Sequence, residues 1–208
     1  MYTIYLCHMK ANTRKFVNHV RNHLAEYGFT LHLGKGRRVN SNEGWRAEGF
    51  FDAGAKCIKV GRGGIQWLET LVHEYAHFLQ WLDSSDSLAD REDRAARLVQ
   101  DYLHAGKGEL NPAVVKAFRR VMLFERDAEM RAVKCIQKYK LNIEMSNYIK
   151  RANMYIYTHY INMMLRKWNF KKSPFHSPKV ISEMPDTFRA KSHKSCPNRI
   201  FRLLKAYY

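Results

Sequence analysis

The chain has few cysteines, and they are far apart. Its 208 residues contain only Cys7, Cys57, Cys135 and Cys196, with no Cys-x-x-Cys pair. Because disulfide frameworks and structural zinc sites use closely spaced cysteines, we expect reduced thiols in a cytoplasmic protein. We expect no secretory signal, since residues 2–7 resemble a strand rather than the apolar core of a leader.

Long hydrophobic runs and prolines are also lacking. No apolar stretch approaches the roughly 20 residues of a membrane-spanning helix, so we expect no membrane partner. Four of the 5 prolines follow residue 173. These features predict one domain over residues 1–170, followed by a basic, proline-containing extension over residues 171–208.

Acidic residues are scarce. Lys and Arg number 36 against 19 Asp and Glu, which gives a net charge of +17. The excess is uneven: residues 61–103 carry 4 basic and 8 acidic side chains, whereas residues 166–208 carry 11 and 2. This pattern suggests an acidic partner such as nucleic acid. It is equally typical of a solubilising surface, and no known nucleic-acid-binding motif is present.

The most informative motif is His-Glu-Tyr-Ala-His at residues 73–77, within an apolar stretch predicted to be helical. Residues four apart share a helix face, so His73 and His77 can present two imidazoles to one metal ion. Glu74 lies one step round the helix, where it can reach a water on that metal. Two neutral imidazoles and an adjacent carboxylate suit metal-assisted hydrolysis. The alternative is an ordinary buried helix.

A second acidic motif occurs downstream, in a segment predicted to be helical over residues 112–139. Glu125 and Glu129 are four apart and share a face. One can bind a metal while the other holds a histidine ligand through its second ring nitrogen. The alternative is a solvated helix face on which Arg126 and Arg131 neutralise the two acids.

Together the two motifs resemble the gluzincin class of zinc metallopeptidases, and the chain is similar to the small predicted metallopeptidases of phage genomes and to the ImmA/IrrE type. The resemblance covers roughly residues 56–140. It implies that His73, His77 and Glu125 bind zinc, that Glu74 is the general base and that Glu129 supports the ligands.

A competing resemblance would change the third ligand. SprT-like zinc proteases use three histidines, which would make His104 the third ligand here. The metzincin pattern is absent, because Gln80 and Asp83 stand where its glycine and third histidine should be.

The implied reaction is peptide hydrolysis by a water that zinc makes more acidic, with Glu74 taking the proton and passing it to the leaving amine. A donor for the developing oxyanion is usually needed as well. Tyr155 and His159 are candidates on a helix predicted over residues 143–168, although tyrosines at helical spacing are more often core residues.

The hydrophobic pattern predicts an α+β, zincin-like fold, with a small mixed or antiparallel N-terminal sheet and a mainly helical C-terminal half. We expect strands at residues 2–7 and 29–33, a hairpin of strands at 47–52 and 56–60, and a loop at 34–44. A helix is expected at 13–27, with an apolar stripe formed by Phe16, Val17, Val20 and Leu24. Further helices are expected from 68 to 168, broken near 84–87 and 105–111, with Asn111 as the N-cap of the helix that begins at residue 112.

Three functions are consistent with these patterns. The first is a zinc metallopeptidase with a protein or peptide substrate, for which nucleic-acid-associated proteins are one candidate class. If a phage encodes it, the expected location is the host cytoplasm. The second is a zinc hydrolase of another kind, such as an amidase. The third is a basic nucleic-acid-binding or virion protein that keeps the fold without useful catalysis. The intact Glu74 argues against the third, because a purely structural site needs no base.

Overall fold

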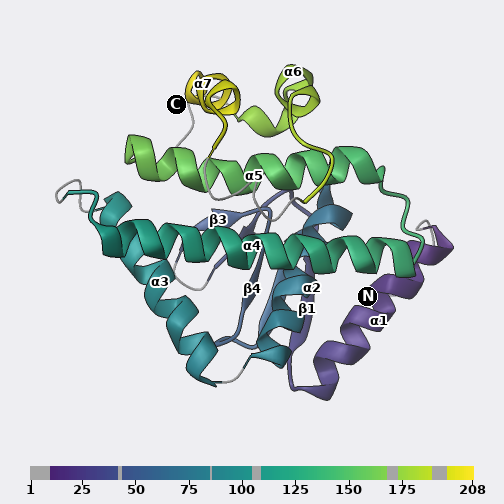
Figure 1. The fold of residues 1–208 in the computed structure, drawn as a ribbon. Coiled ribbons are helices and arrows are strands. Elements are labelled where there is room, and N and C mark those ends of the chain that lie inside the picture. The colour runs from purple at the N-terminus through teal and green to yellow at the C-terminus, as the bar shows by residue number, and fades with distance from the viewer. Residues whose placement is uncertain (1–9, 42–43, 85, 105–108, 168–172, 189–195) are drawn as a thin grey trace. The chain divides into compact units, whose positions relative to one another are not determined.

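The computed structural model describes residues 10–41, 44–84, 86–104, 109–167, 173–188 and 196–208 (Figure 1). It is an α+β structure, as the sequence predicts. The chain forms two compact units: residues 1–83 with 131–143, and residues 84–130 with 144–208. The predicted strand at residues 2–7 lies outside the described residues.

The first unit contains a mixed three-stranded sheet in the order β1-β5-β4. Strand β1 (Thr30–Gly34) is parallel to β5 (Cys57–Gly61), and β4 (Gly49–Asp52) is antiparallel to it. The predicted strands at 29–33 and 56–60 are therefore confirmed, and the one at 47–52 is confirmed over Gly49–Asp52. The predicted loop at 34–44 is wrong in part, because β2 (Val39–Asn40) pairs there with β3 (Arg46–Ala47). A two-residue ladder is too short to produce a recognisable alternation of polar and apolar residues.

Two helices pack against this sheet. Helix α1 (Ala11–Glu26) contacts β1, and α2 (Trp67–Asp83) contacts β4 and β5. The predicted stripe of α1 is fully buried, as expected for an amphipathic helix; its members are Phe16, Val17, Val20 and Leu24.

Glycine brings β4 close to α2. A Cβ added to Gly49 would lie 2.5 Å from Thr70 Cγ2 of α2 and 3.1 Å from the Lys59 carbonyl oxygen of β5. Such distances leave no room for a side chain. Because Gly49 has no side chain, α2 can approach the sheet at Thr70, one turn before His73 and Glu74.

Helix α4 (Pro112–Lys138) is one continuous helix of 27 residues. Asn111 caps it as predicted, since its Oδ1 accepts a hydrogen bond of 3.0 Å from the Val114 N–H. The unit boundary falls within α4, so that residues 131–138 belong to the first unit and residues 112–130 to the second.

The described residues of the second unit form helices joined by turns and loops, with no strand among them. Besides its part of α4 it contains α3 (Asp86–His104), α5 (Met145–Leu165), the 3-10 helix η2 (Pro174–His176), α6 (Pro178–Ser182) and α7 (Asn198–Lys205). The predicted helix at 143–168 is thus confirmed as α5. One core cluster joins α3, α4 and α5 around Phe118, Val99 and Met163.

The described part of the predicted extension packs on α5. Val180 of α6 and both Ile200 and Leu204 of α7 share a buried cluster with Met154 and Tyr157 of α5, and Figure 1 shows α6 and α7 lying along that helix. Two of the prolines begin short helices, since Pro174 is the first residue of η2 and Pro178 the first of α6. Within the described part of the chain, no helix combines the length and the apolarity that a membrane crossing requires.

Candidate metal centre

Helix α2 places His73 and His77 side by side. Their Nε2 atoms are 3.1 Å apart, and their rings are 4.6 Å apart and nearly perpendicular. Two nitrogens that bind one tetrahedral zinc at 2.0–2.1 Å are separated by about 3.3 Å. The two imidazoles are therefore at the spacing that one shared ion needs, and both side chains are half-buried.

The second ring nitrogen of His77 is also fixed. Its Nδ1–H donates to Oε1 of Gln80, at 2.8 Å, and Gln80 is buried. Because this nitrogen is the donor, Nε2 carries the lone pair that a metal ligand needs. The sequence analysis missed this role of Gln80; the signal available was a polar residue one turn beyond the second histidine on a buried helix face.

Glu125 belongs with the two histidines. His73, His77 and Glu125 each offer one ligand atom, and these atoms all lie within 4.8 Å of one another. Two imidazoles and one carboxylate form a donor set that suits a catalytic zinc. His104, the alternative third ligand, is exposed at the end of α3 and is not a member of this group.

An ion pair holds the C-terminal half of α4 to α2. Arg131 Nη1 lies 2.5 Å from Asp83 Oδ2 at the last residue of α2. Glu125 is six residues earlier on the same continuous helix, which is about 9 Å along the axis. In the alternative interpretation, Arg126 and Arg131 neutralise Glu125 and Glu129. In the structure Arg131 forms an ion pair with Asp83, and Arg126 donates to the Phe188 carbonyl oxygen at 3.0 Å.

Glu74 is held inside the unit rather than in solvent. Its side chain is only 9% exposed, and its neighbours Leu71, Val72 and Ala76 on the same helix are fully buried. The predicted base is therefore a buried side chain on the same helix as both histidines.

The back of the motif is anchored to α1. Tyr75 is buried, and its hydroxyl lies 3.0 Å from His19 Nε2 and 2.7 Å from His23 Nδ1. Burial raises the pKa of Tyr75 above its ordinary value. Burial, followed by the nearby His23, lowers the pKa of His19. Neither α1 histidine was a predicted functional residue, although their spacing of four is visible in the sequence.

Glu129 is buried in the second unit. It is 5% exposed, and Tyr148 Oη of α5 donates to its Oε2 at 2.5 Å. The contact orients the carboxylate, which a supporting acid needs. That Glu129 holds a histidine ligand stays a prediction.

The two predicted oxyanion donors contact each other on α5. The Tyr155 and His159 rings are 5.0 Å apart in an edge-to-face arrangement, and His159 is 3% exposed. Tyr155 also lies 6.3 Å from the Phe175 ring of η2. These contacts describe two packed rings, and the oxyanion role of either one stays a prediction.

Comparisons of this chain with protein-family models, with curated proteins and with solved structures found no match.

Proposed function

We propose that this protein is a zinc-dependent metallopeptidase. The observation that carries the proposal is the convergence of His73, His77 and Glu125, whose ligand atoms all lie within 4.8 Å of one another. The hydrogen bond that His77 donates to Gln80 supports it, since a histidine ligand usually donates its second ring N–H to a neighbouring acceptor.

Zinc, when bound, supplies a Lewis acid for the substrate carbonyl and makes a water acidic enough to attack at neutral pH. The chain itself moves the proton. Glu74, next to His73 and buried, accepts it from the attacking water and delivers it to the leaving amine. Tyr155 and His159 are the proposed donors to the oxyanion.

The sheet offers a place for an extended substrate. Strand β4 is at the edge of the three-stranded sheet and contacts α2, the helix of the motif. A peptide that adds to such an edge gains main-chain hydrogen bonds in a fixed direction. This favours a peptide over the cell-wall amide that an amidase would hydrolyse.

The decisive experiment compares wild-type protein with Glu74→Gln. Both variants should contain zinc, because Glu74 is not a proposed ligand. Cleavage of a fluorescent denatured casein should fall by about 10² to 10⁴ in the variant, the usual contribution of a general base. Equal rates in the two proteins would contradict the proposed mechanism. Release of amine from cell-wall fragments, without casein cleavage, would favour the amidase.

A further inference from the structure

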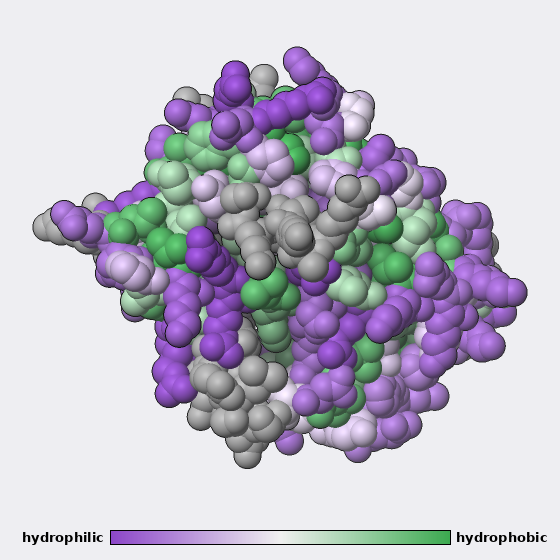
Figure 2. Space-filling model, viewed as in Figure 1, coloured by the Kyte–Doolittle hydropathy of each residue, from purple (hydrophilic) through white to green (hydrophobic). Residues whose placement is uncertain are grey.

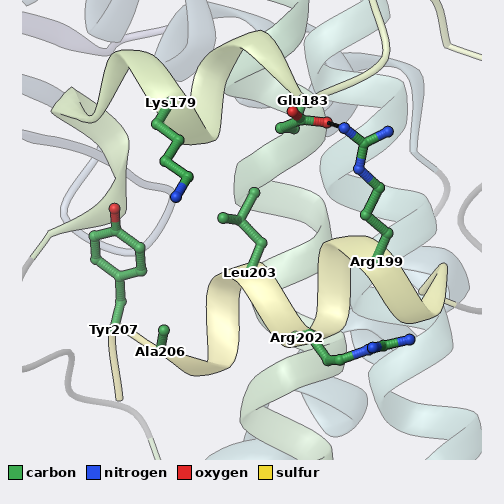
Figure 3. Close-up of a pocket in the computed structure, with 7 residues that line it drawn as sticks. All are labelled: Lys179, Glu183, Arg199, Arg202, Leu203, Ala206 and Tyr207. Carbon is green, nitrogen blue, oxygen red and sulfur yellow. Dashed lines mark ion pairs between the residues drawn. The ribbon is translucent and has the colours of Figure 1, made fainter.

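A cleft lies between α6 and α7 in the second unit, separate from the proposed metal ligands. It has a volume of about 840 Å³ and is lined by Lys179 of α6, by Glu183 directly after α6, and by Arg199, Arg202 and Tyr207 from α7 and the residues after it. Figure 3 shows Lys179, Glu183 and Arg199 between the two helices, whereas Arg202 extends from the outer side of α7. Every one of them belongs to the same unit, so one packed arrangement sets their spacing.

The cleft walls are fixed by a buried core. Val180 of α6 and Ile200 and Leu204 of α7 pack in the cluster on α5. Because these apolar positions point inward, the basic side chains of both short helices point outward; Lys179, Arg199 and Arg202 are all exposed. Their positions therefore do not depend on a partner being present.

The charge of the cleft is strongly positive. Arg199 forms an ion pair with Glu183, the one acid among the lining residues. Lys179 and Arg202 remain as uncompensated cations in the cleft, and Lys205 extends the basic row along α7, which contains no acid. In Figure 2 the surface over α6 and α7, at the top of the view, carries a dense group of hydrophilic side chains.

The side chains suit a phosphate ligand. Arg199 and Arg202 are three apart on one helix, so their Cβ atoms are about 5–6 Å apart and both can contact one stretch of a charged backbone. Guanidinium groups bind phosphate oxygens in pairs. Tyr207 adds a half-buried ring, and its hydroxyl is held 3.0 Å from Ser177 Oγ. An aromatic ring beside a row of cations is the usual composition of a single-strand-binding groove.

We propose that the cleft between α6 and α7 binds single-stranded nucleic acid. Lys179 and Arg202 each contact a phosphate of the strand, and the ring of Tyr207 stacks on a base. Arg199 is shared between Glu183 and the backbone. This site gives the large positive charge of the chain a specific location, and it does not depend on the metal centre.

The test measures binding of a fluorescent oligothymidylate of about 20 nucleotides by anisotropy at several salt concentrations. The double variant Lys179→Gln/Arg202→Gln should weaken binding about tenfold or more. The slope of log affinity against log salt should fall by about 1.4, because each lost phosphate contact on a single strand contributes about 0.7. Tyr207→Ala should weaken binding about 5- to 100-fold, whereas Tyr207→Phe, which keeps the ring, should change it little.

The matched control is Arg14→Gln/Lys15→Gln. It removes two exposed cations from α1 in the other unit, so the net charge changes equally. Affinity and slope should stay near those of the wild type, and unfolding midpoints should show that all variants are folded. Equal losses in the two double variants would mean general attraction to a basic protein and would overturn the proposal. So would no binding by the wild type, or displacement of the oligonucleotide by an equal charge of polyglutamate.

Discussion

Two histidine pairs in the first unit have the same spacing and opposite arrangements. On α2, the rings of His73 and His77 are nearly perpendicular with their Nε2 atoms 3.1 Å apart. On α1, His19 and His23 are stacked 5.6 Å apart, and both bond the Tyr75 hydroxyl. The first pair turns two lone pairs toward one point, whereas the second uses its nitrogens to hold a neighbouring side chain.

The difference shows that two histidines four residues apart on a helix do not always turn their ring nitrogens toward one point. A helix brings two rings to one face, but their orientation depends on what each second nitrogen contacts and on whether a third ligand is near. His77 Nδ1 donates to Gln80, and Glu125 offers the third atom of a group that could hold a metal ion. The α1 pair instead faces a phenol whose pKa is raised by burial, which keeps that hydroxyl protonated.

The largest expected effect is loss of zinc. His77→Ala and Glu125→Ala should each lower the zinc content from about one ion per chain to near zero, because two remaining ligands rarely retain the ion. His23→Ala, the matched change in the α1 pair, should keep it. Elemental analysis of dialysed, folded protein measures this. Retention of zinc in Glu125→Ala combined with its loss in His104→Ala would point to the three-histidine alternative.

A smaller effect is expected from the residue that distinguishes the two pairs. Gln80→Leu removes the acceptor for His77 Nδ1 while keeping a side chain of similar size. Zinc affinity, measured by competition with a chromophoric chelator, should fall about 10- to 100-fold. Gln80→Glu retains an acceptor and should recover most of it.

The control for this change is Gln137→Leu, an exposed position near the end of α4. It should leave the affinity unchanged. If Gln80→Leu bound zinc as tightly as this control, the hydrogen bond from His77 to Gln80 would not contribute to zinc affinity.

The third effect tests how α2 is positioned. Gly49→Ala places a methyl group 2.5 Å from Thr70 Cγ2, so β4 and α2 must separate. We expect the free energy of unfolding to fall by about 1–3 kcal/mol, as for other overpacked sites. Gly54→Ala, where the nearest atom is 3.5 Å away, should change it by less than about 0.5 kcal/mol. Urea unfolding of both variants gives the comparison, and equal stabilities would show that the sheet can yield at Gly49.

The sequence predicts the features that depend on local periodicity. The stripe from Phe16 to Leu24, the cap at Asn111 and the hairpin of β4 and β5 are all local, and the structure contains each of them. The group of His73, His77 and Glu125 was also predicted, because the motif and the second acidic pair are visible as short strings.

The contacts that the sequence did not predict join segments far apart in the chain. Tyr75 meets His19 and His23 more than 50 residues away, and Tyr148 bonds Glu129 across 19 residues. Neither partner in such a contact has a periodic signal. The role of Gln80 is local, but it depends on a ring orientation that spacing does not determine.

The smallest expected effect is a pH dependence that comes from the α1 pair. The folded pKa of His19 lies below its ordinary value of 6.5, chiefly because of burial, with Lys138 and His23 also lowering it and Glu26 opposing. Above pH 6.5 His19 is neutral in both states and its contribution to stability is complete. As the pH falls below this value the unfolded chain takes up a proton that the folded protein resists, so stability is lost down to the folded pKa. The His19→Gln side chain cannot titrate, so this variant should lose part of the pH dependence of the free energy of unfolding between about pH 7 and pH 5. The slope should differ from that of the wild type by at most about 1.4 kcal/mol per pH unit, measured by urea unfolding. A wild-type profile as flat as that of the variant would mean that His19 titrates as freely as an exposed histidine. The contact with Tyr75 would then not depend on the neutral form of His19.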